Sequence, residues 1–378
     1  MHSLQSYFET FIKVSDFISR NNRNEKCWCD SGKKFKNCHL NREKSIPLTI
    51  QEEQEKLKKI DTSFKLCLFN KFDNNCSNGI IKAHSVSKEL FLRKISKNNN
   101  VYSPIINTIK HNIIIKEVHV NNASIFYGFC NTHDTSLFSD FEQKKFTSTD
   151  CQLLKISYRS LCLEIFKKMK VIEKYYFYKN NSDKGKELSK QIDIQIQCNQ
   201  EIIFNKNSLN TLEKIQTQLE DDVINNTSHK MKHCLITLDK PQNILCSSMV
   251  SPEFNLDRKR LQSLKATPNA KNLFLNSFIF NNTGYILISW LIEDDDYGNN
   301  FSNSIFSDPT LINHKLISLI LMYTENVFIS PSWWDDLTDE DKHHFQCLIE
   351  YIEDKDQGGI LNIKDHPEAL NYSYHVFI

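Results

Sequence analysis

Apolar residues recur every three or four positions over residues 4–19, the spacing of one face of an amphipathic helix. The residues on that face are Leu4, Tyr7, Phe8, Phe11, Ile12 and Ile18. The same period predicts two further helices over 151–178 and 208–225, with Ser208 as the candidate N-cap of the second. A proline followed by many charged residues in 45–64 predicts a charged helix that connects two parts of the chain.

Shorter apolar runs have the character of strands. Residues 232–240 predict one strand, and 273–292 predict a hairpin whose strands are joined by an Asn-Thr-Gly turn. Earlier in the chain, the segments GIIKAHSV and HNIIIKEVHV also predict strands. Two helices are expected after the hairpin, in 309–326 and 338–354, with Thr338 as the N-cap of the second.

The composition is that of an ordinary globular protein, with 40% hydrophobic and 25% charged residues. Only 8 of 378 residues are glycine, and neither GxGxxG nor GxxxxGK[ST] occurs, which argues against a glycine-rich phosphate-binding fold. Residues 1–20 lack the basic start of a signal peptide, and the longest apolar runs, such as 285–292, are too short to span a bilayer. We therefore expect a cytoplasmic protein whose 12 cysteines are metal ligands and core residues rather than disulfides.

Charge is distributed unevenly along the chain. The first 150 residues carry 23 Lys and Arg against 16 Asp and Glu, a net charge of +7. The rest carries 24 against 30, a net charge of −6, and the two parts sum to the total of +1. The basic N-terminal part favours an acidic partner such as nucleic acid or an acidic protein.

The closest grouping of candidate metal ligands lies in CWCDSGKKFKNCHL, residues 27–40. Two pairs of ligands, Cys27 with Cys29 and Cys38 with His39, flank a short loop. Zinc takes four nitrogen or sulfur ligands in a tetrahedron, and Gly32 permits the left-handed turn that brings the pairs together. A segment this short cannot fold on hydrophobic burial, so metal binding would supply its folding energy.

This stretch resembles the SEC-C motif, which ends the bacterial translocation motor SecA and is appended to many other proteins. Asp30 departs from the motif, where glycine is usual. The residues that fit it are Cys27, Cys29, Ser31, Gly32, Lys33, Lys34, Phe35, Lys36, Cys38 and His39. The resemblance implies a Cys3His zinc module that docks onto a chaperone, the ribosome or an anionic surface.

The lysines of this module are its candidate partner-binding residues. Residues 20–46 hold 8 Lys and Arg against 3 Asp and Glu, so Lys33, Lys34 and Lys36 would offer a basic face to an acidic partner. Simple solubility is the alternative explanation of these charges. We expect the module to be separable from the fold of the rest of the chain.

A second and looser pattern occupies residues 67–134. Cys67 with Cys76 and Cys130 with His133 form two ligand pairs, and His84 lies between them after an apolar segment. This order resembles the zinc-stabilised ββα-metal, or HNH, nucleases. The resemblance implies that His84 is the general base that activates water and that Asp134 is an oxygen ligand of Mg²⁺ or Mn²⁺.

The second pattern also departs from those nucleases. The eight residues between Cys67 and Cys76 exceed the usual two, and Ala83 precedes His84 where an acidic or histidine metal ligand is common. The spacing of Asn121 or Asn122 fits the middle asparagine only roughly. A rival ligand set therefore stays open, in which His84 joins three ligands and Cys67 is left out. The rival set consists of Cys76, His84, Cys130 and His133, and it would make the module a structural zinc-binding treble clef.

These patterns divide the chain into five parts. They are an N-terminal helix (1–20), a SEC-C module (21–45), a helical connector (46–66), an HNH-like treble-clef module (67–150) and a domain of unknown role (151–378). The predicted fold class is therefore α+β, with small zinc modules and a larger α+β C-terminal domain.

Two functions follow from these patterns. The first is a two-zinc protein that acts on or near nucleic acid, as an HNH-like metal-dependent nuclease. Such modules usually occur in bacterial defence systems or mobile elements, which suggests that setting here. The second is a non-catalytic zinc adaptor that docks through its SEC-C module. Tyr158 and Arg159 are candidates for an interaction surface. The remaining cysteines are expected in the core; they are Cys151, Cys162, Cys198, Cys234, Cys246 and Cys347.

Overall fold

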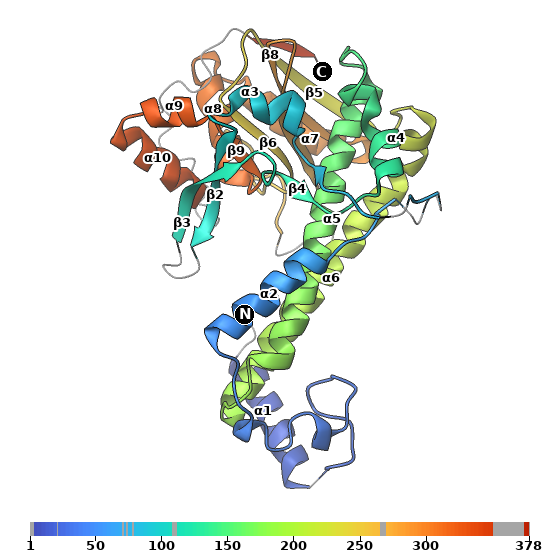
Figure 1. The fold of residues 1–378 in the computed structure, drawn as a ribbon, viewed down its shortest axis with the longest axis vertical. Coiled ribbons are helices and arrows are strands. Elements are labelled where there is room, and N and C mark those ends of the chain that lie inside the picture. The colour runs from blue at the N-terminus through green and yellow to red at the C-terminus, as the bar shows by residue number, and fades with distance from the viewer. Residues whose placement is uncertain are drawn as a thin grey trace. The chain divides into compact units, whose positions relative to one another are not determined.

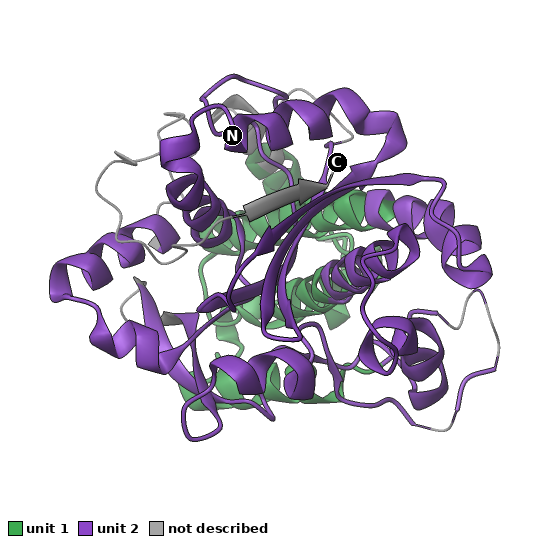
Figure 2. Ribbon diagram, turned by 90° about the horizontal axis from the view of Figure 1, so that it is seen from above, with its two compact units in different colours: residues 1–65, 167–210 green, residues 66–166, 211–378 purple. Residues whose placement is uncertain are grey.

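The computed structural model describes residues 4–20, 22–69, 72, 75–77, 79–107, 112–264, 270–350 and 374–377. The chain forms two compact units (Figure 2). Unit 1 contains residues 1–65 and 167–210, and unit 2 contains residues 66–166 and 211–378. The boundary passes through two long helices, α5 (Asp150–Asn181) and α6 (Leu188–Asn225), so each contributes residues to both units. The five-part division predicted from the sequence stays a prediction.

Unit 1 is helical. Helix α1 (Leu4–Ser19) covers the predicted range, and α2 (Ile50–Ser63) lies inside the segment predicted as a charged connector. At the start of α2, Thr49 Oγ1 accepts from the Glu52 N–H at 3.2 Å, while the Glu52 carboxylate accepts from the Thr49 N–H at 2.8 Å. This reciprocal capping box satisfies two backbone donors that a helix otherwise leaves unpaired. The capping residues therefore explain why the helix begins where it does.

Helix α6 corrects one prediction. The helix begins at Leu188 and runs without a break to Asn225, so Ser208 lies in its interior and is not an N-cap. The physical reason is a stripe of buried side chains that continues at helical spacing on both sides of Ser208. Its members are Ile192, Gln195, Cys198, Ile202, Asn205, Leu212, Ile215, Leu219 and Val223. Packing along this stripe outweighs the weak helix preference of serine.

Unit 2 is built on an eight-stranded sheet, in the order β10-β5-β8-β7-β6-β9-β2-β3 (Figure 1). Among the described residues, neighbouring strands within it pair antiparallel. Its strands are β2 (Asn100–Asn107), β3 (Asn112–His119), β5 (Met231–Leu238), β6 (Ile244–Val250), β7 (Leu273–Phe280), β8 (Thr283–Leu291), β9 (Val327–Ile329) and β10 (Tyr374–Phe377). Together with the helices this gives the predicted α+β class. The predicted strands at 232–240 and in HNIIIKEVHV correspond to β5 and β3, although residue 111 lies outside the described residues.

Both faces of this sheet are covered, so the central strand β7 is buried at every position. In β7, Leu273 and Leu275 join a core formed with helices on one face. On the opposite face, Asn276 Oδ1 accepts from Ser160 Oγ of α5 at 2.7 Å. The helices of the first face are α7 (Asp295–Ile305), α8 (Ile312–Tyr323), α9 (Pro331–Asp336) and α10 (Asp339–Glu350).

The hairpin of β7 and β8 confirms the predicted pair of strands but moves its turn. The turn residues are Asn281 and Asn282, with φ of +45° and +63°, because asparagine tolerates the left-handed conformation that a tight hairpin requires. Gly284 lies in β8, where it pairs with Ile279. A side chain there would meet the Gln242 amide oxygen, with a Cβ only 2.1 Å away, so close packing explains this glycine.

Helix α10 begins as the sequence predicts. Thr338 Oγ1 accepts from the Asp341 N–H at 3.1 Å, which makes it an N-cap. Residues 351–354 of the predicted helix lie outside the described residues. Among the residues that the structure describes, no helix combines the length and the apolar character that crossing a membrane demands.

A small ββα arrangement lies next to the large sheet in unit 2. Strand β1 (Ala83–His84) pairs antiparallel with β4 (Ile125–Phe126), and α4 (Asn131–Glu142) follows. Only two residues of the predicted strand GIIKAHSV thus form a strand. Between β1 and β4 the chain makes β2 and β3, which belong to the large sheet. The ββα arrangement is therefore interrupted by an insertion that is bound into the rest of unit 2.

Candidate metal centres and the adjoining cleft

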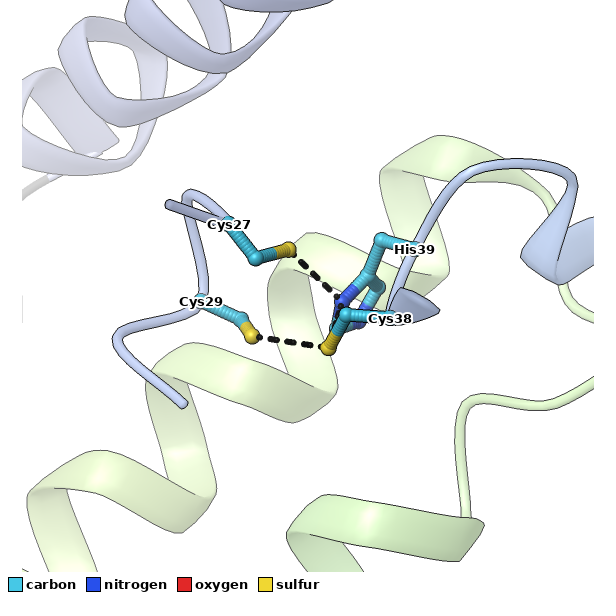
Figure 3. Close-up of side chains that lie close together, drawn as sticks. All are labelled: Cys27, Cys29, Cys38 and His39. Atoms are coloured by element: carbon cyan, nitrogen blue, oxygen red, sulfur yellow. Dashed lines mark hydrogen bonds between the residues drawn. The ribbon is translucent and has the colours of Figure 1, made fainter. Parts of the chain in front are cut away.

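The first cluster of metal-type ligands is formed by two short segments of unit 1. Cys27 and Cys29 lie on one loop, and Cys38 and His39 follow a single 3-10 turn, with all four side chains directed toward one another (Figure 3). Gly32 has a φ of +72°, so the predicted left-handed turn is confirmed. Asp30, with a φ of +57°, is also left-handed, which explains why glycine is usual at its position in the motif.

The spacing of these ligand atoms fits a tetrahedral zinc ion. His39 Nδ1 lies 3.2 Å from Cys27 Sγ and 3.2 Å from Cys38 Sγ, and Cys29 Sγ lies 3.5 Å from Cys38 Sγ. Zinc bonds of standard length place two ligand atoms of a tetrahedron about 3.5–3.8 Å apart. All four atoms lie within 4.8 Å of one another. The cluster is thus compact enough for a single Cys3His zinc site.

Aromatic side chains support this cluster. Phe35 is buried and meets the ring of Phe17 from α1 edge-to-face at 5.4 Å between centroids. The ring of Trp28 lies 4.4 Å from that of His39. Phe35 therefore makes the apolar contact expected of so small a module. The loop's three lysines, Lys33, Lys34 and Lys36, are exposed.

A carboxylate that sequence reasoning missed completes the surroundings of His39. Asp183 lies after the end of α5 and is fully buried. Its Oδ2 accepts from His39 Nε2 at 2.7 Å and from Gln195 Nε2 at 2.8 Å. Its Oδ1 accepts from Arg42 Nε at 2.8 Å. No local pattern marks Asp183, which lies 144 positions from His39.

The second cluster lies in unit 2 and has the same donor set. His133 Nδ1 lies 3.1 Å from Cys67 Sγ, 3.5 Å from Cys76 Sγ and 3.4 Å from Cys130 Sγ. Cys130 directly precedes α4 and His133 lies in its first turn, so the helix start holds two ligands. These distances also fit a tetrahedral zinc site. Cys67 completes the cluster and His84 is outside it, so the rival ligand set that includes His84 is not the one that the fold assembles.

A cleft of about 530 Å³ opens beside the second cluster in unit 2. His84 and Asp134, which sequence reasoning paired, both line it. Its remaining lining residues are Lys82, Ala83, Ser87, Lys88, Glu89, Asn121, Glu142 and Arg159. Asn121, the candidate for the middle asparagine, is thus at the same place as His84.

Backbone contacts orient the ring of His84. Its Nδ1 lies 3.0 Å from the Ala123 carbonyl oxygen and 3.1 Å from Ser124 Oγ. A carbonyl oxygen only accepts, so Nδ1 carries the proton and Nε2 keeps its lone pair. Burial of the ring lowers the pKa of His84 from its ordinary value of 6.5. At neutral pH the imidazole is therefore uncharged and able to accept a proton.

Asp134 and Glu142 of α4 share a buried cation from α5. Arg159 Nη1 donates to Glu142 Oε1 at 2.7 Å, and Nη2 lies 4.0 Å from Asp134 Oδ1. The guanidinium lies 3.9 Å above the ring of Phe138. Asp134 Oδ1 has no hydrogen-bond partner, and burial raises the pKa of its carboxyl group. The Arg159 guanidinium is thus the cation that faces this buried oxygen.

The environment of Arg159 corrects a sequence-based interpretation. Arg159 is only 3% exposed and Tyr158 is fully buried, so the two do not form an interaction surface. Because an arginine in a helix is usually on the surface, the sequence alone did not place Arg159 beside Asp134 and Glu142. Among the other cysteines, four are buried as predicted, whereas Cys151 and Cys347 are half-buried.

Comparison with known proteins finds one similarity. Residues 23–41 match the family model of the SEC-C motif, which agrees with the first Cys3His cluster and with zinc binding. No curated protein and no solved structure matches the chain. The family match ends at residue 41 and does not extend to the second cluster. The likeness of residues 67–140 to HNH nucleases thus has no support from these comparisons.

Proposed function

We propose that the protein is a two-zinc, metal-dependent phosphodiesterase that cleaves nucleic acid in the cleft beside its second Cys3His cluster. One observation carries the proposal: His84 and Asp134 line the same cleft. Hydrolysis of a phosphodiester needs a base beside the attacking water and positive charge beside the phosphate. The resemblance to ββα-metal nucleases assigns these two tasks to the same two residues.

His84 would act as the general base. The Ala123 carbonyl holds Nδ1, so Nε2 is the atom that would take the proton from water. The hydrogen bond also restrains rotation of the ring, which reduces the cost of orienting it. A base of this kind typically contributes on the order of 10²–10⁴-fold to the rate.

Asp134 would hold a divalent cation. Its unpartnered Oδ1 fits this role, and Glu142 offers a second carboxylate nearby, although Ala83 offers no ligand. Mg²⁺ is commonly held by one or two carboxylates together with water and substrate phosphate, so a third protein ligand is not required. When bound, Mg²⁺ or Mn²⁺ would supply charge neutralisation at the scissile phosphate.

Positive side chains around the cleft support an anionic substrate. Lys82 and Lys88 line the cleft, and the buried Arg159, held by Glu142, adds its positive charge to the cleft wall. Lys82 is exposed, and Lys88 is paired with Glu89 at 3.0 Å. Positive charge of this kind suits an anionic phosphodiester better than a neutral substrate.

The alternative function is a non-catalytic zinc adaptor. The exposure of Lys33, Lys34 and Lys36 favours it, because a basic loop next to a zinc site suits docking onto a ribosome, a chaperone or another acidic surface. Ala83 also favours the adaptor, because alanine has no side-chain atom that could bind a metal in the cleft. The adaptor would need no role for His84.

The test is cleavage of single-stranded and duplex DNA and RNA in Mg²⁺ or Mn²⁺. We expect His84→Ala to lose activity by about 10²–10⁴-fold while retaining both zinc ions, because the ring is outside the cluster. His343→Ala is the matched control, since that exposed histidine of α10 does not line the cleft. Zinc content is measured on all three proteins.

Three other results would contradict this assignment of the active site. Zinc loss in His84→Ala would make the histidine a structural ligand. Undiminished cleavage in that variant would put the active site outside this cleft. A wild-type protein that cleaves no substrate with either metal would favour the adaptor.

A further inference from the structure

We propose that Asp183 is the positioning residue of the first zinc site, and that zinc binding there and ordering of the turn between α5 and α6 are one coupled event. The proposal is independent of any activity in the cleft. It concerns unit 1 alone, because residues 27–39 and the turn at 182–187 both belong to that unit.

The hydrogen bond between His39 and Asp183 determines which ring nitrogen of His39 carries the proton. Asp183 Oδ2 lies 2.7 Å from His39 Nε2, so this nitrogen donates its proton to the carboxylate. The opposite nitrogen, Nδ1, then keeps its lone pair and faces the three thiols. Histidines that bind metals are commonly oriented in this way by a carboxylate at the second nitrogen, which also raises the basicity of the first.

Asp183 is itself held too firmly to be an incidental neighbour. Arg42 and Gln195 donate to it in addition to His39, so both carboxylate oxygens are used. A fully buried carboxylate is costly unless it is paired and hydrogen-bonded, and here its partners come from two separate segments. The partners belong to the zinc module's own C-terminal end and to α6.

A second set of contacts joins the same two segments. Gly185 donates its N–H to the Arg42 carbonyl at 3.1 Å and has a φ of +70°. A side chain at Gly185 would meet Pro47, with its Cβ 2.7 Å from the ring. The turn between α5 and α6 is therefore shaped to close on the chain just after His39. Whatever loosens the turn also loosens the orientation of His39, and linkage makes the reverse true.

The first test compares zinc retention in competition with a chelator. Asp183→Asn keeps the shape of the side chain but places an amide where two acceptor oxygens are needed. We expect one of the two zinc ions to bind about 10–100-fold more weakly, and the other to be unchanged. In a Cys27→Ser background, which removes the first site, adding Asp183→Asn should leave retention of the remaining zinc unaltered.

The matched control is Asp222→Asn. Asp222 is also buried and accepts from the backbone N–H groups of His229 and Lys230 at 2.9 Å, but it is not in contact with any proposed zinc ligand. It should lower stability without weakening zinc. Equal zinc retention in wild type and Asp183→Asn, or an equal loss in both aspartate variants, would overturn the proposal.

A second measurement uses the wild type, so it does not depend on how the variants fold. Amide hydrogen exchange of residues 182–187 is followed with and without zinc. Coupling predicts that exchange in this turn accelerates when zinc is removed, together with exchange in 27–39. Acceleration in 27–39 with an unchanged turn would show that Asp183 is only a structural neighbour.

Discussion

The two Cys3His clusters have the same ligands but draw them from very different lengths of chain. In the first, Cys27 and His39 are 12 positions apart; in the second, Cys67 and His133 are 66 apart. The first cluster is therefore local, and it contacts the rest of unit 1 through Asp183 and through the packing of Phe35 on Phe17. The second joins a loop to the start of α4, so it holds a part of the fold together. The same metal chemistry thus serves a small module in one place and a framework in the other.

Under the proposed function, this difference has a consequence for activity. The cleft adjoins the second cluster, because Asp134 directly follows the ligand His133 and β4 leads into the same helix. A framework zinc can set the direction of neighbouring side chains to the precision that catalysis needs. We therefore expect perturbation of the second cluster to affect both stability and activity, and perturbation of the first to affect chiefly metal binding and docking.

The largest expected effect comes from breaking each cluster in turn. Cys130→Ser and Cys27→Ser should each remove one zinc ion per chain. Because structural zinc contributes on the order of 10 kcal/mol of binding energy, Cys130→Ser should also unfold the segment around α4, which carries the buried rings of Phe138 and Phe141. Elemental analysis and thermal unfolding by circular dichroism measure the two effects.

Cys27→Ser should lose its zinc and leave the main unfolding transition where it is in the wild type. A fall in melting temperature as large as that of Cys130→Ser would mean that both clusters are frameworks. If Cys130→Ser retained two zinc ions, the second cluster would not be a zinc site.

A smaller effect is expected from pH, and it concerns the cleft alone. A base must be unprotonated, and the pKa of His84 is lowered from 6.5 by burial. The acidic limb of the kcat/KM profile should therefore lie below pH 6.5, with the rate falling about tenfold per pH unit beneath it. Cleavage of one substrate at saturating metal, measured from pH 4.5 to 8, would check this. An acidic limb above 6.5 would contradict His84 as the base.

The smallest effect is expected from the loop of the first cluster. Asp30 adopts a φ of +57°, a conformation that glycine takes without cost. Asp30→Gly should consequently hold its zinc slightly more firmly, by about 1 kcal/mol, the lower end of the cost of a left-handed L-residue. Chelator competition measures the change, and Asp16→Gly within α1 is a control that should destabilise instead. Weaker zinc binding in Asp30→Gly would mean that the aspartate side chain has a role of its own.

The sequence was most informative where the physical cause is local. The ligands of the first cluster lie close together in the sequence, with Cys27 only 12 positions from His39, and Gly32 indicates the turn between the two pairs. Thr338 begins α10 because capping depends only on the next three residues. Periodicity likewise located α1 and α5 without any knowledge of their partners.

Local sequence signals failed where packing between distant segments determines the structure. Ser208 resembles an N-cap, but a buried stripe carries α6 past it. Arg159 is a single charged residue within a helix and Asp183 a single charged residue in a turn, and only the fold brings each to its site. The position of Cys67 in the second cluster was open for the same reason, since loop length alone does not determine which ligands meet.

The contact between His39 and Asp183 also bears on the order in which the chain is made. His39 precedes Asp183 by 144 residues, an interval of roughly 7–30 s at usual rates of synthesis. All four ligands of the first cluster leave the ribosome well before their outer carboxylate does. The nascent chain therefore passes through a stage in which it can take up zinc but cannot yet hold His39 in place. If Asp183 positions His39 as proposed, we expect metal to exchange most readily during that stage, until the α5–α6 turn is complete.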